Sequence, residues 1–283
     1  MKFNTKCVHG SGRPDSTGAI SPAIYMSSTF SHPKLGDTTG YQYTRESNPT
    51  RDRLEQLIAG LEDGTDALAF SSGMAAVDAV FHLFSPGDHI ILGDDLYGGS
   101  IRMFTNIYEQ NGIEFTYVGT SDLDAVKAAF KPNTKAVYIE TPTNPMMEIT
   151  DIRALCALAH ERNALVIIDN TFLSPYFQKP LTLGADIVVH SGTKFIGGHH
   201  DVISGFTIVN DQELAAKLRL TYKTVGACLS AMDSWLVIRG VKTLALRMEQ
   251  HQKNAIALAE WLKKQPKVTK VLFPGLPEHP GYE

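Results

Sequence analysis

One lysine stands out for the chemistry it could perform. Lys194 lies in "DIVVHSGTKFIGGHHDVISG" (residues 186–205), between a hydroxyl-bearing turn and a run of glycines and histidines. Three interpretations compete: a phosphate clamp, a metal site made by His199, His200 and Asp201, or a nucleophilic amine that holds a carbonyl cofactor. Each interpretation requires different neighbours, so the surrounding residues can be used to choose among them.

The first two interpretations lack the neighbours that they need. A P-loop requires Gly-x-x-x-x-Gly-Lys-Ser/Thr, whereas Lys194 stands in Ser-Gly-Thr-Lys-Phe with no upstream glycine run. Adjacent side chains in a loop diverge, and no remote histidines with helical spacing complete a metal site around His199, His200 and Asp201. We therefore expect no bound metal, and a metal-dependent hydrolase stays only as a third alternative.

The covalent interpretation uses the position of the lysine. An amine at a strand end in apolar surroundings is desolvated, which favours its neutral form and an imine with an aldehyde. The hydroxyls of Ser191 and Thr193 beside it could bind a phosphate on the same molecule. The competing explanation is a surface lysine on a glycine-rich loop, which is where most lysines lie.

Two further strand ends carry groups that suit such a molecule. In "FSSGMAAVDAVFHLF" a strand, a turn and a helix put the amides of Gly73 and Met74 at a helix N-terminus, which favours a phosphate. "ALVIIDNTF" ends a buried strand on Asp169, a carboxylate that requires a cation or a strong donor. Taken singly, the first is also explained by a plain turn, and the second by a helix cap or a salt bridge to an arginine.

The combination of these groups is what pyridoxal 5'-phosphate requires. The amides bind the phosphate, Lys194 forms the imine with the aldehyde, and Asp169 keeps the pyridine nitrogen protonated. A protonated ring is an electron sink, so the pattern predicts chemistry on an amino acid.

The elements that position these groups alternate regularly. Short apolar runs are separated by amphipathic segments, which favours a mainly parallel sheet covered by helices on both faces. Ligands bind such sheets at the carboxyl ends of the strands. Residues 50–62 have helical spacing, and Ser121 and Thr150 are placed to cap two later helices. The apolar runs are "ALAFSS", "HIILGD", "IEFTYV", "KAVYIE", "ALVIID", "ADIVVHS" and "GFTIV".

Composition limits the partners. The chain has 283 residues and a net charge of -4 without basic clusters, so no nucleic-acid partner is expected. Its three cysteines predict neither a disulfide framework nor a thiolate metal cage, and they suit a reducing cytoplasm. No signal peptide and no membrane-spanning run is recognisable. We expect a cytoplasmic protein that acts on a small molecule.

The chain resembles the Cys/Met-metabolism pyridoxal-phosphate enzymes, which include cystathionine β-lyase, γ-lyase and γ-synthase and methionine γ-lyase. The resemblance runs from residue 5 to the last residue. It implies an α/β fold of the aspartate-aminotransferase type (fold type I) and a homotetramer made of two active dimers. The motifs that carry it are "YTRESNPTRDRLE", "SSGMAA", "DDLYGGS", "ETPTNP", "DNTFLSP", "HSGTKFIGGHHDVISG" and "DSWLVIRGVKTLALRMEQH".

The resemblance also implies roles for single residues. Lys194 binds the cofactor and then moves the substrate's protons, and Tyr97 stacks on the ring and helps the proton transfer. Asn144 lies near the ring hydroxyl. Tyr43 and Arg45 reach the phosphate of the adjacent subunit's cofactor. The remaining cofactor-binding residues are Asp169 at the pyridine nitrogen and Gly73, Met74, Ser191 and Thr193 at the phosphate.

By this resemblance the protein is a C–S lyase that eliminates a thiol from cystathionine or a similar thioether amino acid. Methionine γ-lyases usually have Cys after the Tyr-Gly pair, where this chain has Gly99, so methionine cleavage is disfavoured. The alternative reaction is γ-replacement on an O-acyl-homoserine, as in cystathionine γ-synthase. The sequence leaves the preferred thioether and β- versus γ-chemistry open.

Three regions are expected along the chain. Residues 1–45 form an arm that contacts a neighbouring subunit, residues 46–235 form the cofactor-binding domain, and residues 236–283 form a linking helix and the start of a truncated C-terminal domain. The family's arginine for the substrate α-carboxylate lies beyond residue 283. We expect either a fragment or a shortened relative, and a non-catalytic cofactor-binding pseudoenzyme or scaffold is the alternative from another class.

Overall fold

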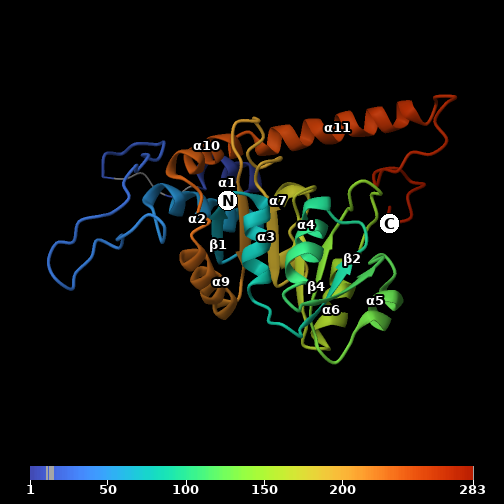
Figure 1. Cartoon of the computed structure of the whole chain (residues 1–283). Helices are drawn as coiled ribbons and strands as arrows, with labels where there is room; N and C mark the ends of the chain where they lie inside the picture. The colour runs from blue at the N-terminus through green and yellow to red at the C-terminus, as the bar shows by residue number, and fades with distance from the viewer. Residues whose placement is uncertain (11, 13–15, 283) are drawn as a thin grey trace.

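The centre of the structure is a 7-stranded sheet in the order β1-β7-β6-β5-β4-β2-β3. The computed structural model describes residues 1–10, 12 and 16–282 (Figure 1). Each apolar run of the sequence forms one strand, as expected. The strands are β1 (Asp66–Phe70), β2 (His89–Gly93), β3 (Glu114–Val118), β4 (Thr134–Glu140), β5 (Leu165–Asp169), β6 (Ile187–Ser191) and β7 (Gly205–Val209).

The sheet is mainly parallel, which confirms the predicted fold class. The pairs β2–β3, β2–β4, β4–β5 and β5–β6 are parallel. Strand β7 runs antiparallel to both of its neighbours, β1 and β6. Because β4, β5 and β6 are parallel neighbours, their last residues Glu140, Asp169 and Ser191 meet at one edge of the sheet.

Helices cover both faces of the sheet because successive strand residues point to opposite sides. On β2, Ile90 and Leu92 join the apolar cluster under α3, whereas Ile91 joins the cluster under α6. One face carries α3 (Gly73–Phe81), α4 (Gly98–Met103), η1 (Phe104–Tyr108) and α9 (Gln212–Val225). The other face carries α2 (Pro49–Glu62), α5 (Leu123–Ala129), α6 (Ile152–His160), α7 (Ser174–Phe177), α8 (Pro180–Leu183) and α10 (Ala231–Val241).

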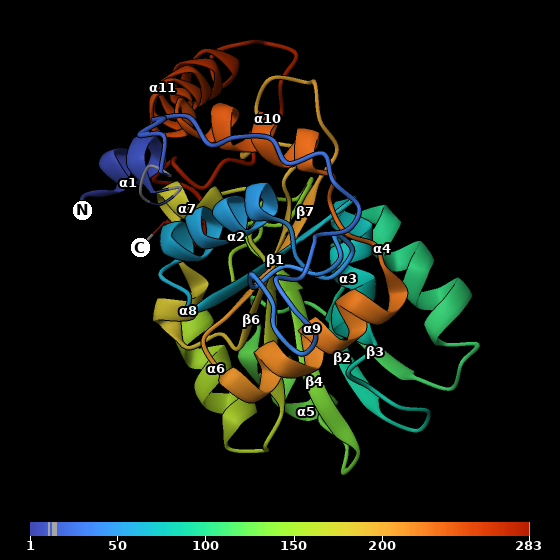
Figure 2. The same cartoon turned by 90° about the vertical axis from the view of Figure 1, so that its left-hand side faces the viewer.

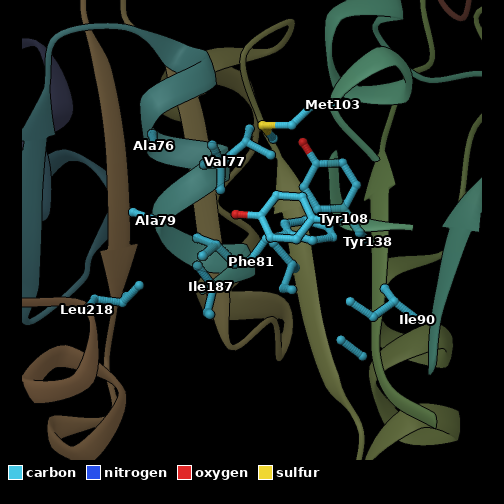
Figure 3. Packing of buried hydrophobic residues seen from close by; sticks show 14 of the residues in the cluster. Ala76, Val77, Ala79, Phe81, Ile90, Met103, Tyr108, Tyr138, Ile187 and Leu218 are labelled. Carbon is cyan, nitrogen blue, oxygen red and sulfur yellow. The ribbon is translucent and has the colours of Figure 1, made fainter. Parts of the chain in front are cut away.

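An aromatic cluster fixes α3 on the sheet. Phe81 of α3 stacks on Phe104 with 4.3 Å between ring centroids and meets Tyr138 of β4 edge-on at 5.8 Å. Figure 3 shows Phe81 beside Tyr138 and Tyr108, with Val77 one turn earlier on the same helix. Because Phe81 is the last residue of α3, this apolar packing anchors the C-terminal end of the helix to the sheet, and the N-terminus lies at the cavity.

The helix predicted over residues 50–62 is confirmed as α2, and the side chain of Asn48 caps it. The two other predicted caps are wrong by one residue. Asp122 instead of Ser121 caps α5, and Asp151 instead of Thr150 caps α6. The Thr150 hydroxyl lies 2.7 Å from the Thr120 hydroxyl. In both turns a carboxylate competes with a neighbouring hydroxyl and accepts the helix amides.

The N-terminal residues contain a helix that the sequence pattern does not predict. Helix α1 (Phe3–His9) packs on α2, with Cys7 only 2% exposed. Its apolar residues are too few for a periodic signal, so docking stabilises it. From residue 16 to the start of α2 the chain is a long extended loop on the outside of the molecule (Figure 1).

The helical C-terminal region is divided in two. Two consecutive helices, α10 and α11 (Leu244–Leu262), are separated at residues 242–243, and Figure 2 views α11 nearly end-on. Helix α11 runs past the sheet (Figure 1) and exposes Leu246, Leu258 and Trp261. None of the helices in the described part of the chain combines the length and the apolar character that crossing a membrane requires.

Candidate active site

A cavity of about 1050 Å³ opens where the parallel strands end. Glu140, Asp169 and Ser191, the last residues of β4, β5 and β6, all line it. The predicted site residues that line the cavity are Lys194, Tyr97, Asp169, Gly73, Met74, Ser191, Thr193 and Asn144. The fold thus gathers the strand-end residues from five separate sequence segments into one place.

The start of α3 supplies hydrogen-bond donors to this cavity. The Ser72 side chain accepts from the Ala75 amide at 3.1 Å, so the Gly73 and Met74 amides occupy the first helical positions, which have no intrahelical acceptor. Only glycine fits at position 73, because an added Cβ would lie 2.8 Å from Ser191 Cβ. The helix start and the end of β6 therefore form one corner that suits a phosphate.

Hydrogen bonds hold the turn that carries Lys194. The Gly198 amide donates to the Lys194 carbonyl at 2.8 Å, and the Thr193 hydroxyl donates to the Ser204 carbonyl at 3.2 Å. The Lys194 side chain is exposed to the cavity. The expected apolar surroundings of this amine are therefore not found, because Lys194 is exposed.

Two carboxylates lie side by side at the cavity wall. Glu140 and Asp169 are paired in register on β4 and β5. Burial raises the pKa of Asp169, although hydrogen bonds from Thr171 oppose it. Burial, together with the charge of Asp169, raises the pKa of Glu140 to about 8. Among the described residues no salt bridge joins either carboxylate to a cation, so both favour a ligand that brings positive charge.

Tyr97 and Asn144 complete the rim of the cavity. Tyr97 is the N-cap residue of α4 and its side chain is 54% exposed. Asn144 is exposed and precedes the cis Asn144–Pro145 bond. Both side chains are free to meet a ring held between Lys194 and Asp169.

Tyr43 and Arg45 lie on the N-terminal loop, away from this cavity. The Arg45 guanidinium stacks on the Tyr43 ring at 5.1 Å, and it donates to the Lys223 carbonyl. Within one chain the two side chains meet each other and α9. Their contact with a neighbouring subunit's cofactor stays a prediction.

The residues of the alternative metal site do not converge. Nδ1 of His199 lies 2.8 Å from the Gly197 carbonyl. Among the residues that the structure describes, no group of three or more His, Cys, Asp and Glu side chains is placed to hold a metal ion. His200 and Asp201 instead line the outer part of the cavity.

The donors present fit a phosphorylated pyridine aldehyde. The helix amides suit the phosphate, the cavity-facing amine of Lys194 suits the aldehyde, and the cation-free Asp169 suits a protonated ring nitrogen. The apolar walls around them include Met74, Val77 and Phe172. The cavity is wide enough for a ring together with a bound amino acid.

The sequence did not reveal two residues of the cavity as site residues. Glu140 was visible only as a strand-end residue, without a partner to suggest a role. Arg247 comes from α11, and its guanidinium donates to the carbonyls of Phe195 (2.7 Å) and Gly240 (3.2 Å). No spacing in the sequence links position 247 to the turn that carries Lys194, so only the fold brings them together.

Comparisons with known proteins agree with this site. A cystathionine beta-lyase of Lactococcus lactis subsp. cremoris (strain MG1363) is 50% identical over 282 residues, covering 99% of this chain and 74% of that protein. A cystathionine gamma-lyase of Bacillus subtilis (strain 168) is 49% identical, covering 100% of this chain and 75% of that protein. A crystal structure of cystathionine gamma-lyase from Lactobacillus plantarum complexed with L-serine superposes with a TM-score of 0.97 at 50% identity, covering 100% of this chain and 74% of that one.

The sequence profile of one enzyme family covers nearly the whole chain. Residues 4–283 match the family described as Cys/Met metabolism PLP-dependent enzymes. The relatives named above carry the lyase names that the motifs around Lys194, Asp169 and Tyr97 had suggested. The chain therefore belongs to the Cys/Met metabolism PLP-dependent enzyme family.

Proposed function

We propose that the protein is a pyridoxal-phosphate-dependent carbon–sulfur lyase that eliminates a thiol from cystathionine or a similar thioether amino acid. The observation that carries this proposal is the convergence of Lys194, Asp169 and the N-terminus of α3 on one cavity. The names of the relatives at 50% and 49% identity supply the substrate class.

The cofactor would be held at three points. Lys194 binds its aldehyde, Asp169 accepts the hydrogen bond of the ring nitrogen, and the Gly73 and Met74 amides with Ser191 and Thr193 bind the phosphate. Tyr97 covers one face of the ring and Asn144 lies at its hydroxyl. When bound, the cofactor supplies a sink for the electron pair left at Cα.

The protein side chains then move the protons. The Lys194 amine would remove the Cα proton of the bound substrate, and Tyr97 would assist this proton transfer. When the thiol leaves from Cβ and takes up a proton, hydrolysis of the remaining three-carbon product by one water molecule would give pyruvate and ammonia. Departure from Cγ needs further proton shuttling by Lys194 and Tyr97. In this account Asp169 keeps its negative charge throughout and so keeps the ring nitrogen protonated.

The same proposal includes the assembly and location of the protein. We infer a cytoplasmic homotetramer of two active dimers, in which residues 1–45 are the arm that brings Tyr43 and Arg45 to a neighbour. Residues 46–235 are the cofactor-binding domain, and residues 236–283 begin the second domain. The free thiols of Cys7, Cys156 and Cys228 support a reducing compartment.

A γ-replacement on an O-acyl-homoserine is the second candidate. A cystathionine gamma-synthase of Mycobacterium tuberculosis (strain H37Rv) is 47% identical over 282 residues. The cavity residues proposed to hold the cofactor suit either reaction, because both begin with removal of the Cα proton. The two reactions therefore have to be separated by their products.

The test is covalent trapping followed by product analysis. Borohydride reduction of the cofactor-saturated protein is expected to attach the cofactor to Lys194, as read by peptide mass spectrometry. Lys194→Ala should abolish both the adduct and the visible absorbance band. Lys217→Ala is the matched control, because Lys217 is an exposed lysine paired with Glu213 on α9.

The products then distinguish the candidates. Release of a keto acid from cystathionine supports the lyase, with pyruvate for departure from Cβ and 2-oxobutyrate for departure from Cγ, and cystathionine formed from an O-acyl-homoserine and cysteine supports the γ-synthase. A lysine adduct with neither product supports a non-catalytic cofactor-binding protein. An unmodified Lys194 in saturated wild-type protein overturns the proposal as a whole.

A further inference from the structure

The loop that carries Tyr97 is anchored to the neighbouring strand at one carboxylate. The Tyr97 amide donates to Glu140 Oε2 at 3.2 Å. Glu140 ends β4 and is only 7% exposed, whereas the Tyr97 side chain is 54% exposed. A buried strand residue thus fixes the main chain of Tyr97, the N-cap residue of α4, while the Tyr97 side chain stays exposed.

The Tyr97 ring occupies the space next to Gly99 that a side chain at position 99 would fill. A Cβ added to Gly99 would lie 2.4 Å from Tyr97 Cε1, and no other atom comes as close. Gly99 is buried, so its backbone has little freedom to retreat, and the ring would have to turn away. The preceding glycine differs, because a Cβ added to Gly98 would meet nothing within 4 Å.

We propose that Glu140 is a positioning residue, which holds Tyr97 over the cofactor cavity through the Tyr97 amide while Gly99 leaves the space that the ring needs. The proposal rests on the proposed function, in which Tyr97 covers the cofactor ring. Neither Glu140 nor Gly99 has to touch the reacting atoms in this arrangement. Their effect on the cofactor passes through Tyr97.

The surroundings of Glu140 suit the role of a neutral acceptor. Asp169 of β5 and Asp95 of the loop before α4 both raise the pKa of Glu140, in addition to burial, while its bond from the Tyr97 amide lowers it. The resulting pKa of about 8 leaves the carboxyl mainly protonated at neutral pH. A protonated carboxyl keeps one carbonyl oxygen for the amide, and a glutamine side chain offers the same oxygen.

The experiment is a double-mutant cycle read by cofactor binding. Glu140→Ala, Tyr97→Ala and the double variant are titrated with pyridoxal phosphate, and the visible circular dichroism of the bound cofactor is recorded. Glu140→Ala alone is expected to weaken binding about tenfold, through loss of a hydrogen bond and a stacked ring. In the Tyr97→Ala background the same change is expected to cost less than about twofold.

Conservative and paired variants separate positioning from folding. Glu140→Gln keeps the acceptor and is expected to bind within about threefold of wild type. Gly99→Ala is expected to alter the visible circular dichroism and weaken binding, whereas Gly98→Ala leaves the circular dichroism of the bound cofactor as in wild type. Should Glu140→Ala fail to fold, Glu140→Gln and the two glycine variants still decide the matter.

Two results would overturn the inference. One is an equal effect of Glu140→Ala with and without the Tyr97 ring, which would mean that Glu140 acts on another group. The other is a Gly99→Ala protein whose bound cofactor matches that of Gly98→Ala. Failure of the proposed function is a separate result, because the wild-type protein would then form no lysine adduct at all.

Discussion

Buried carboxylates lie on both sides of the same sheet edge, and they differ in the side chains that surround them. Glu62, at the end of α2, is fully buried, and its Oε1 lies 2.5 Å from Nε2 of His190 and 2.8 Å from the donating amide of Asn170. Glu140 and Asp169, at the cavity, lie next to each other and in no described salt bridge. Glu62 is paired with a histidine, whereas Glu140 and Asp169 accept hydrogen bonds from Tyr97 and Thr171 and lie in no salt bridge among the described residues.

The difference identifies which group is structural and which groups await a ligand. A buried charge is costly unless hydrogen bonds or an opposite charge compensate it. The Asn170 side chain also bonds Gln178, so Glu62 belongs to a network that ties α2, β6 and the segment after β5 together. The cavity pair has no basic partner among the described residues, and a cationic ring beside Asp169 would supply one.

The largest expected effect is loss of the partner of Glu62. His190→Leu leaves a buried carboxylate without its imidazole, and breaking such a pair typically costs about 3–5 kcal/mol. We expect a loss of about 3 kcal/mol in the free energy of unfolding, because Asn170 still donates to Glu62. Urea denaturation at neutral pH, followed by circular dichroism, measures it.

The control for this change is an exposed pair of the same chemistry. His160 on α6 lies 2.9 Å from Asp186, and the two side chains are 45% and 23% exposed. His160→Leu is expected to cost less than about 1 kcal/mol, since exposed pairs contribute little. Equal losses in the two variants would contradict the view that the Glu62 network supports the sheet edge.

The second effect concerns the pH dependence of the cavity pair. Because the pKa of Glu140 is raised from 4.5 to about 8, the native state binds more protons than the unfolded state between these values. The free energy of unfolding therefore falls as pH rises through this window. Glu140→Gln cannot ionise, so the cofactor-free variant is expected to lose less stability than wild type from about pH 5 to about pH 9.

The expected difference in the free energy of unfolding follows from the raised pKa of Glu140. One pKa unit corresponds to about 1.4 kcal/mol, and we expect a relative gain of about 2 kcal/mol at the upper pH after allowing for relaxation of the open cavity. Thermal or urea unfolding of both proteins at the two pH values measures it. Parallel pH profiles for wild type and variant would show that Glu140 is not the titrating group.

The sequence predicted much of the sheet because the signal is local. Each strand is a short apolar run, and each run became one strand with ends within two residues of those expected. The direction of β7 was not predictable in the same way, since pairing depends on partners distant in sequence. Helix α1 also escaped prediction, because its burial of Cys7 comes from docking on α2 and not from periodicity.

The residues of the candidate site also differ in whether a local sequence signal predicts them. Lys194, Asp169 and Gly73 were predictable because each stands where a strand ends, and that position has a chemical meaning. Arg247 was not, because it reaches the turn of Lys194 from a helix more than fifty positions later. Glu140 was visible but had no assignable role, since its contact joins the end of β4 to Tyr97, which is more than forty positions earlier in the chain.

The smallest expected effect belongs to a carboxylate outside both regions. Asp63, just after α2, bonds Lys6 and Lys179 at 2.5 Å each, and its side chain is 38% exposed. Partial burial alone would raise the pKa of Asp63, but the two lysines lower this pKa overall. Its contribution to stability is therefore present above pH 3.8 and is lost as pH falls through the lowered value.

Asp63→Asn should cost less than about 1 kcal/mol at neutral pH, and less still at high salt, because solvent screens exposed pairs. Urea unfolding at low and high salt measures this loss. A loss as large as that of His190→Leu would mean that exposure does not separate these carboxylates, and burial would then not explain why the Glu62 network contributes more to stability.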